Sequence, residues 1–465
     1  MVFAPHSVAA SSIGVAIAVI GWLLRTVASR SLGLQKTPFD LIICLSLLWT
    51  SLSAIFSTEP RISIPKLEAL WSVLIFYLAR AVLTRRSTLL LVGVLIVSAT
   101  TGVLYSVFDL VRGRGVVVES IPSSSPFQQI GLQAGDTIWR INRQRIYSIA
   151  EIDSALKANN TVSVSVISKG EHAEKPVVKI SQEMRTQASP SGLSGKVRSH
   201  QFRASGWTRH YETFAEVLQI VVQLSLGLAL AHLRNHGPNK YFKLGLLVTG
   251  VLALGIALTA MRTLLIAFAI GAIVTAFRSL RGVPKIIFAA ALLLVLGVGT
   301  LAIWRARADN ALLLGDPSST LRAEVARTGF SRIWIHPIFG HGMDAMKLHW
   351  NEWGFPGTDM VHLHSTPLQL AFDRGLPMVA LWLWLMIAFW FHLWRSVSQS
   401  SELGDTNSFG LLLGSLGALT GFLASSLVNY NYGDSEVTML FWFVMGMSVA
   451  MTTFNSNATT NSPTR

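Results

Sequence analysis

Residues 408–429, SFGLLLGSLGALTGFLASSLVN, carry no charged side chain and decide the fold class of this chain. The run is long enough to cross a bilayer as a helix, which takes about 20 residues. Over 465 residues, 51% are hydrophobic and 13% are charged, and the mean hydropathy is +0.49. This composition excludes an ordinary soluble domain and predicts an α-helical polytopic membrane protein. Similar windows predict about 11 transmembrane helices, at 7–24, 40–57, 67–84, 88–110, 212–233, 243–260, 263–277, 286–303, 366–394, 408–429 and 435–453.

Basic residues are concentrated in alternate loops between these windows. One such loop holds Arg85 and Arg86 and another holds Arg281, whereas the intervening loops have few Lys or Arg residues. The positive-inside rule therefore places the basic loops in the cytoplasm and both long polar segments, 112–211 and 304–365, on the outer face. The net charge of +14 follows from these loops. Because the basic residues form no stripe, a nucleic-acid partner is not expected.

The first long polar segment has the pattern of a small inserted α+β domain. Residues 115–120, 136–142 and 162–166 are typical of strands, the last by its strict alternation, and 149–158 is typical of an amphipathic helix. Residues 183–210 are polar and lack periodicity. They are predicted to form a flexible tether back to the membrane.

The run GLQAGDTI at 131–138, followed by Ile141 and Asn142, resembles the signature of a PDZ domain of the kind attached to bacterial envelope proteases. The resemblance spans about 113–182. It implies that the domain binds an extended peptide by strand addition, with a carboxylate-binding loop near 112–115. A spacer that binds nothing is the alternative. The chain has no His-Glu-x-x-His or Gly-x-Ser-x-Gly motif, so it is not itself expected to be a protease.

The second polar segment, 319–375, gathers arginine and histidine side chains between apolar runs. It contains Arg322, the turn HPIFGHG at 336–342, and HLHS at 362–365 directly before an apolar window. Such a cluster is costly near lipid and is therefore a candidate functional site. Arginines from separate segments would bind phosphate without a metal ion. No Cys/His or Asp/Glu spacing indicates a metal site.

Other candidate residues lie where helices begin at the outer face. His210 and Tyr211 open the window that follows the tether. For Tyr211 or Arg209 taken alone, the alternative is a role as an interfacial anchor. Arg262 is the only charged residue between Lys243 and Arg278. It either extends from an outer turn or faces a polar cavity in the helix bundle.

Two histidines precede the window at 366–394. Residues i and i+2 of an extended chain point to the same side, so His362 and His364 would face one site. Imidazole can accept a proton from a hydroxyl near neutral pH, which makes either a candidate general base. His364 is better fixed because it abuts the helix. The alternative for such a histidine is a structural hydrogen-bonding role.

Taken in order, these segments resemble the O-antigen ligase and O-unit polymerase family of bacterial membrane glycosyltransferases. The matching pieces are short and degenerate, so their order and common outer-face placement carry the resemblance. They lie at 203–215, 261–263, 322–342, 364–375 and 429–436.

The resemblance implies a GT-C-like fold in the bacterial cytoplasmic (inner) membrane. A glycan on undecaprenyl pyrophosphate would be transferred on the periplasmic side to a glycolipid, a glycan or a protein, with inversion and without a metal or cofactor. Arg203, Arg262 and Arg322 would neutralise the pyrophosphate leaving group, and His364 would be the catalytic base. Possible sugar-binding residues are His210, Tyr211, Asp434 and Glu436.

Two residues depart from the family pattern, since Ser365 stands where asparagine is common and Pro377 where glycine is frequent. The inserted domain suggests a peptide or protein partner. It leaves open a protein O-glycosyltransferase, or a non-catalytic polysaccharide flippase or export component scaffolded by this domain. The predicted organisation is transmembrane helices 1–4 at 1–111, the PDZ-like domain at 113–182, a tether at 183–210, helices 5–8 at 211–303, an outer-face loop at 304–365, helices 9–11 at 366–454 and a cytoplasmic tail at 455–465.

Overall fold

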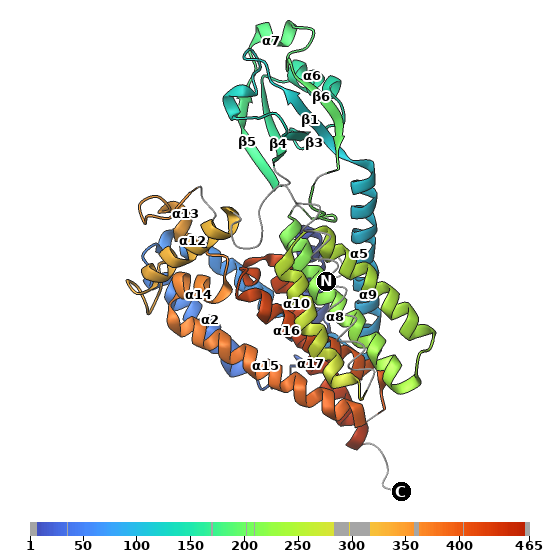
Figure 1. Cartoon of the computed structure of the whole chain (residues 1–465). Coiled ribbons are helices and arrows are strands. Elements are labelled where there is room, and N and C mark those ends of the chain that lie inside the picture. The colour runs from blue at the N-terminus through green and yellow to red at the C-terminus, as the bar shows by residue number, and fades with distance from the viewer. Residues whose placement is uncertain are drawn as a thin grey trace. The chain divides into compact units, whose positions relative to one another are not determined.

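The computed structural model describes residues 7–34, 36–168, 171–200, 202–208, 210–282, 297, 317–357, 362–402 and 404–460. The chain forms two compact units (Figure 1). One, here called the α+β unit, is Val103–Gly206. The other, called the membrane unit, combines Met1–Gly102 and Trp207–Arg465.

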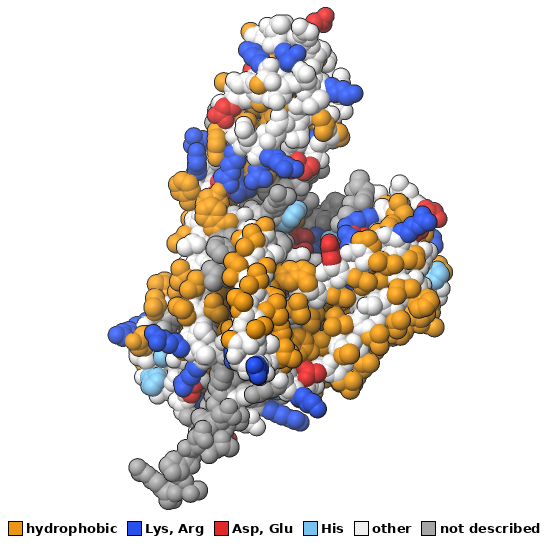
Figure 2. All heavy atoms as spheres, turned by 180° about the vertical axis from the view of Figure 1, so that it is seen from behind, with side chains coloured by type: hydrophobic (Ala, Val, Ile, Leu, Met, Phe, Trp, Pro, Cys, Tyr) orange, Lys and Arg blue, Asp and Glu red, His pale blue; other side chains and the backbone are white. Residues whose placement is uncertain are grey.

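Eight helices in the described part of the chain are long and apolar enough to cross a membrane. Hydrophobic side chains are exposed along them, including Leu247 at 65% and Ile266 at 58%, and Figure 2 shows such side chains covering much of one face. The chain is therefore a polytopic helical membrane protein. The eight helices are α1 (Val8–Ser29), α5 (Arg85–Arg112), α8 (Tyr211–His236), α9 (Lys240–Leu258), α10 (Arg262–Ser279), α15 (Leu376–Glu402), α16 (Thr406–Ser426) and α17 (Ser435–Thr460).

Two predicted windows near the N-terminus form shorter elements. Window 40–57 corresponds to α2 (Asp40–Phe56), which is shorter than the eight spans. Window 67–84 is not one helix. After α3 (Pro60–Ser63), the 3-10 helix η1 (Pro65–Val73) leads into α4 (Leu74–Val82). Pro60 and Pro65 each begin a new element, because proline fits the first turn of a helix but not its interior.

The window at 366–394 is also divided, into α14 (Thr366–Arg374) and α15. The break is at Gly375, whose φ is +80° and where a Cβ would lie 1.8 Å from the carbonyl oxygen of Ile338. Only glycine fits this close approach, so the helix ends and restarts. The predicted helix at 286–303 lies outside the described residues except for residue 297. The predicted count of about 11 spans is therefore not confirmed.

Helix α8 forms the centre of the membrane unit, since 94% of its apolar window is buried. Gly227 lies against α16, where a Cβ would come within 2.4 Å of the carbonyl oxygen of Gly410. Gln223 Nε2 donates a hydrogen bond to the carbonyl of Phe268 on α10 at 2.7 Å. Small residues and buried polar contacts are what hold helices together in lipid, where apolar burial gives little driving force. This packing fixes the position of the first turn of α8.

The α+β unit contains a six-stranded antiparallel sheet with the order β5-β4-β2-β1-β6, and β3 pairs with β2. Its core includes Val116, Ile138, Ile152 and Val164, all fully buried. Three strands and one helix coincide with the predicted elements. The bounds are β1 (Arg114–Ser120), β2 (Thr137–Ile141), β3 (Gln144–Arg145), α6 (Ile149–Ala158), β4 (Thr161–Ser168), β5 (Glu171–Lys179), α7 (Gln182–Thr186) and β6 (Ser194–Ser199).

The segment predicted to be a tether, 183–210, is structured in part. It contributes most of α7 and all of β6, which pairs antiparallel with β1 from Arg114↔Ser199 to Ser120↔Ser194. Gly195 makes this possible, because a Cβ there would lie 2.4 Å from the carbonyl oxygen of Val117. The pairing uses backbone groups, which leave no periodic signal in the sequence.

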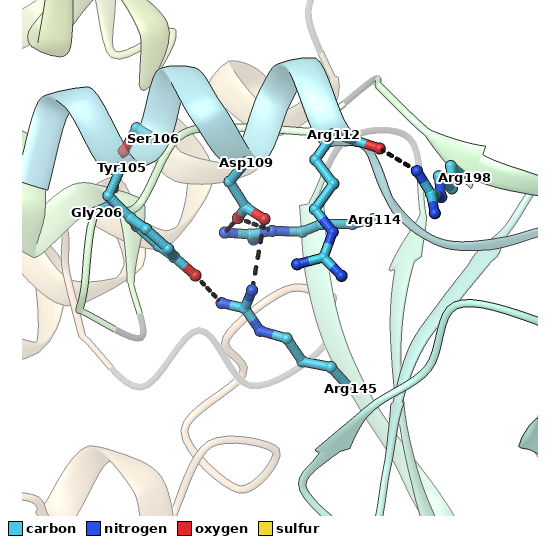
Figure 3. A network of polar contacts seen from close by, with 8 residues as sticks. All are labelled: Tyr105, Ser106, Asp109, Arg112, Arg114, Arg145, Arg198 and Gly206. Atoms are coloured by element: carbon cyan, nitrogen blue, oxygen red, sulfur yellow. Dashed lines mark hydrogen bonds and ion pairs between the residues drawn. The ribbon is translucent and has the colours of Figure 1, made fainter.

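The end of α5 is tied to the sheet by a buried ionic network within the α+β unit (Figure 3). Arg114 pairs with Asp109, and their side chains are 5% and 2% exposed. Arg145 Nη1 lies 3.5 Å from the other Asp109 oxygen and also contacts Tyr105. The guanidinium of Arg112 lies 4.5 Å from the ring centroid of Tyr147. The loop at 112–115 is therefore tightly held, with Arg114 already paired to a carboxylate of its own chain.

Candidate active site

The first turn of α8 lies against the loop that precedes α17. Thr213 Oγ1 donates to Asp434 Oδ2 at 2.6 Å. Burial raises the pKa of Asp434, and the bond from Thr213 and the nearby His210 oppose that rise. His210 is the N-cap of α8, Tyr211 is its half-buried first residue, and Glu436 lies in the first turn of α17. The residues predicted to contact sugar thus come from helix ends that meet.

Arg322, on α12 (Pro317–Ile333), reaches the same end of α8. Its Nη2 lies 3.4 Å from Glu212 Oε1, and the two side chains are 28% and 32% exposed. An ion pair of this length and exposure contributes about 0–1 kcal/mol. The buried Nε of Arg322 has no hydrogen-bond partner among the described residues. Arg322 therefore has a donor that the described residues do not use.

His364 lies in a tight turn directly before α14. Its φ is +51°, in the left-handed region, which costs about 1–3 kcal/mol for a residue other than glycine. Two bonds hold the turn, from Leu363 N to Gln369 Oε1 at 2.7 Å and from Thr366 Oγ1 to the carbonyl of Asn429 at 3.0 Å. Strain kept in place by such contacts is typical of functional sites.

The rings of His362 and His364 lie 4.5 Å apart between centroids, and His362 lies 5.8 Å from Tyr430. The extended geometry predicted for 362–364 is wrong, because His364 is left-handed. The rings nevertheless meet, across the turn. His364 Nε2 is buried and has no hydrogen-bond partner in the described part of the chain.

Burial, together with the smaller effects of the positive charges of His362 and Arg322, lowers the pKa of His364 to about 3. The imidazole is therefore uncharged at neutral pH and able to accept a proton. It is also a weak base in this state. An anion bound at Arg322 would offset the positive charge and raise the pKa of His364, which would make it a better base when substrate is present.

The turn HPIFGHG at 336–342 supports α14. The amides of His341 and Gly342 donate to the carbonyls of Phe372 and Asp373 at 2.7 and 3.0 Å. At Gly340, where φ is +73°, a Cβ would lie 2.5 Å from the amide nitrogen of Arg374. These glycines allow the turn to pack directly on the end of the helix that begins next to His364.

The structure gives fewer contacts for the other two predicted phosphate-binding arginines, Arg262 and Arg203. Arg262 is the half-buried first residue of α10. Its neighbour Thr263 accepts a hydrogen bond from Asn429 Nδ2 at 3.4 Å, which puts the start of α10 beside the 429–436 loop. Arg203 is half-buried, follows β6 in the sequence and belongs to the α+β unit.

Two residues at the site were not singled out from the sequence. Tyr430 lies beside His362, and burial raises its pKa. Glu216 is 5% exposed, and its Oε2 has no hydrogen-bond partner among the described residues. Its spacing of four residues from Glu212 on one helix was the available signal, because i and i+4 share a face. Among the described residues, no group of three His, Cys, Asp or Glu side chains could hold a metal ion.

Residues 247–383 match the protein-family model described as O-antigen ligase. The match includes Arg262, Arg322 and His364, together with the turn at 336–342. The match supports the activity of an O-antigen ligase-type membrane glycosyltransferase. Such an activity implies a lipid-linked glycan and an acceptor. No curated protein matches the chain.

Proposed function

We propose that this protein transfers or polymerises glycan from undecaprenyl pyrophosphate onto an acceptor hydroxyl, with inversion and without a metal ion. The observation that carries the proposal is the neutral His364 beside Arg322, within the region that matches the O-antigen ligase model. A neutral imidazole accepts protons, and a loosely paired guanidinium binds phosphate. These are the two groups that the reaction requires.

In the proposed reaction, the acceptor oxygen attacks the anomeric carbon while His364 removes its proton. A new C–O bond forms on the face opposite the departing group, which inverts the configuration. The bond from the anomeric carbon to the pyrophosphate oxygen breaks, and undecaprenyl pyrophosphate leaves with the electron pair. Arg322 stabilises the charge that develops on that oxygen, with Arg262 as a further ligand of the pyrophosphate.

We place the site on the periplasmic face of the bacterial inner membrane. Helix α8 has His210 as its N-cap and Arg234 and His236 in its last turn, so more basic residues lie at its C-terminal end. Arg278 lies in the last turn of α10, which begins at Arg262. Since basic loops remain in the cytoplasm, the helix ends that carry His210 and Arg262 lie on the opposite side.

The direct test is glycan transfer by the purified full-length protein. Lipid-linked glycan is mixed with a lipid acceptor, a free glycan acceptor or a protein acceptor, and the product is identified by mass spectrometry. Product on the lipid indicates a ligase, a lengthened glycan a polymerase, and glycosylated protein a protein O-glycosyltransferase. Absence of any product, from protein that binds the lipid-linked glycan, would contradict an enzymatic function and favour the non-catalytic export component.

We also propose that the α+β unit is PDZ-like and recognises an extended peptide at the edge of β1. The β6 strand occupies that edge in cis, so a partner would have to displace it. Replacing Gly195 with valine, which would clash with Val117, should release β6 and increase peptide capture from a displayed peptide library. Unchanged capture would indicate that the unit is a spacer.

A further inference from the structure

A cavity of about 470 Å³ lies in the membrane unit where the last turns of α8 and α10 meet the C-terminal part of α15. Ligand sites in proteins commonly enclose roughly 300–1,000 Å³, so this cavity is large enough for a small molecule or a lipid headgroup. His210 and Arg262 lie at the other ends of α8 and α10. The cavity is therefore separate from the candidate active site.

Three arginines line this cavity. Arg234 and Arg278 are half-buried, and Arg281 is exposed. Arg234 lies within electrostatic reach of the positive charges of Arg281 and Arg278. Like charges that converge without a counter-ion repel one another, and a bound anion offsets that repulsion.

The protein itself supplies little negative charge at this place. Glu402 is the carboxylate on the described part of the wall, and it is exposed. In the part of the chain that the structure describes, no ion pair joins Glu402 to any of the three arginines. This differs from Arg85, at the start of α5, which pairs with Asp405. The wall of the cavity therefore carries a net positive charge.

The two half-buried guanidinium groups are oriented by aromatic rings. The guanidinium of Arg234 lies over the ring of Phe409, 4.8 Å from its centroid, and forms no hydrogen bond with the described residues. That of Arg278 lies 4.2 Å from the centroid of Trp394, and its Nη2 donates to Ser398 Oγ. A ring holds the face of a guanidinium and leaves the N–H groups at its edge free to donate. Arg234 therefore presents donors that the described residues do not use.

A phosphate group suits this arrangement. Guanidinium groups form charge-assisted hydrogen bonds to several oxygens of one phosphate, and these bonds are stronger than bonds between neutral groups. Basic pockets between transmembrane helices, at the ends that carry the basic loops, are known to bind phosphorylated lipid headgroups. The cavity at the last turns of α8 and α10 has both the charge and the position of such a pocket.

An exposed apolar stripe on α10 leads to this cavity. Phe277 lines the cavity and is exposed. Further exposed hydrophobic side chains precede it at spacings of three or four residues, at Ile273, Ile270 and Ile266. Residues with this spacing share one face of a helix. Hydrocarbon chains can follow the stripe while their headgroup occupies the cavity, which favours a phospholipid over free phosphate.

We propose that this cavity binds the headgroup phosphate of an anionic phospholipid, with Arg234, Arg278 and Arg281 donating to its oxygens. The acyl chains lie along the α10 stripe. Under the charge rule that places basic loops in the cytoplasm, the lipid belongs to the cytoplasmic leaflet. The site does not rest on the proposed glycan transfer.

The test uses purified full-length protein in a neutral detergent and a short-chain probe, dihexanoyl phosphatidic acid. Dihexanoylglycerol, which lacks the phosphate, and inorganic phosphate, which lacks the chains, are the comparison ligands. Binding is measured by titration calorimetry and by the shift in thermal unfolding. We expect the wild-type protein to bind the phosphatidic acid about tenfold or more tightly than either comparison ligand, because each of them lacks one half of the contacts.

Two variants locate the binding. Arg234→Gln should weaken binding of the phosphatidic acid by about tenfold or more, the effect of losing a charged hydrogen bond. Arg281→Gln should weaken it several-fold, and because Arg281 is exposed, this variant covers the case in which Arg234→Gln fails to fold. Arg395→Gln is the matched control, since Arg395 is an exposed arginine of α15 that does not line the cavity. Arg322→Gln should also bind the probe normally.

Four results would overturn the proposal. Equal binding of dihexanoylglycerol would mean that the phosphate is not recognised, and equal binding of inorganic phosphate would mean a site for the free anion. An equal loss in Arg395→Gln and Arg234→Gln would indicate a general effect of positive charge. Unchanged binding in Arg234→Gln and Arg281→Gln, with or without a loss in Arg322→Gln, would place the probe elsewhere.

Discussion

Each of the two units of this protein contains an arginine close to a carboxylate, but the two pairs differ in burial and in distance. In the α+β unit, Arg114 and Asp109 are almost fully buried and in close contact, and a second arginine, Arg145, binds the same carboxylate. In the membrane unit, Arg322 and Glu212 are about a third exposed and separated by 3.4 Å. The first arrangement holds a structure together. The second leaves the guanidinium partly exposed.

The largest effect is expected at His364. His364→Ala should reduce glycan transfer by about 10²–10⁴-fold, the range for loss of a general base, while the protein still inserts in the membrane. His362→Ala should reduce it less. The exposed His336→Ala serves as a control with near-normal transfer. Full activity of His364→Ala in a single-turnover assay would contradict the proposed mechanism.

The buried pair of the α+β unit should dominate its stability. Asp109→Ala leaves Arg114 buried without its carboxylate, so we expect a loss of about 3–5 kcal/mol in the free energy of unfolding of this unit. Limited proteolysis of the full-length protein, followed by mass spectrometry of the fragments, reports on it. Lys196→Ala removes the exposed contact to Glu119 and should change the protection little. Equal protease sensitivity of both variants would contradict the prediction.

Arg322, the loosely paired arginine, should affect glycan transfer and not the stability of the fold. Arg322→Gln should lower glycan transfer by about 10- to 100-fold, because a charged hydrogen bond contributes roughly 1.5–3 kcal/mol. Its thermal stability should be close to that of the wild type. Arg327→Gln, an exposed residue on the same helix, is the matched control. A large loss of stability in Arg322→Gln alone would indicate a structural role like that of Arg114.

A smaller effect should appear in the pH dependence of stability. The folded protein keeps His364 neutral down to a pKa of about 3, whereas the unfolded chain protonates it below its ordinary pKa of about 6.5. The unfolded state therefore binds more protons between these values, and stability falls as the pH drops through that window. His364→Gln should lose less thermal stability than the wild type between pH 6.5 and 4.5. Parallel curves for the two proteins would contradict the low pKa.

Local patterns in the sequence predicted much of this molecule. Apolar windows located the eight long helices, and alternation located β4, because both signals arise from each element's own burial. The break at Gly375 was missed because it depends on a carbonyl from Ile338, far along the chain. The β6 strand was missed because it pairs through its backbone while Lys196 stays exposed.

The sequence indicated candidate residues for the site, but it did not indicate their geometry. His364 and Arg322 were expected to act together, and electrostatic coupling between them is present. The left-handed turn at His364 could not be foreseen, since nothing in the HLHS sequence requires it. Glu216 was also missed, because its spacing of four residues from Glu212 does not reveal that it is buried.

The pairing of β6 with β1 determines the boundaries at which the α+β unit can be excised from the chain or deleted. A fragment limited to 113–182 would lack both Asp109 and β6, so it would expose the β1 edge and leave Arg114 without its carboxylate. Exposed strand edges promote aggregation. An excised unit should therefore extend over 103–206, and a deletion intended to remove the unit should remove that same range, so that a failure in the remaining protein reports on function and not on an unpaired strand.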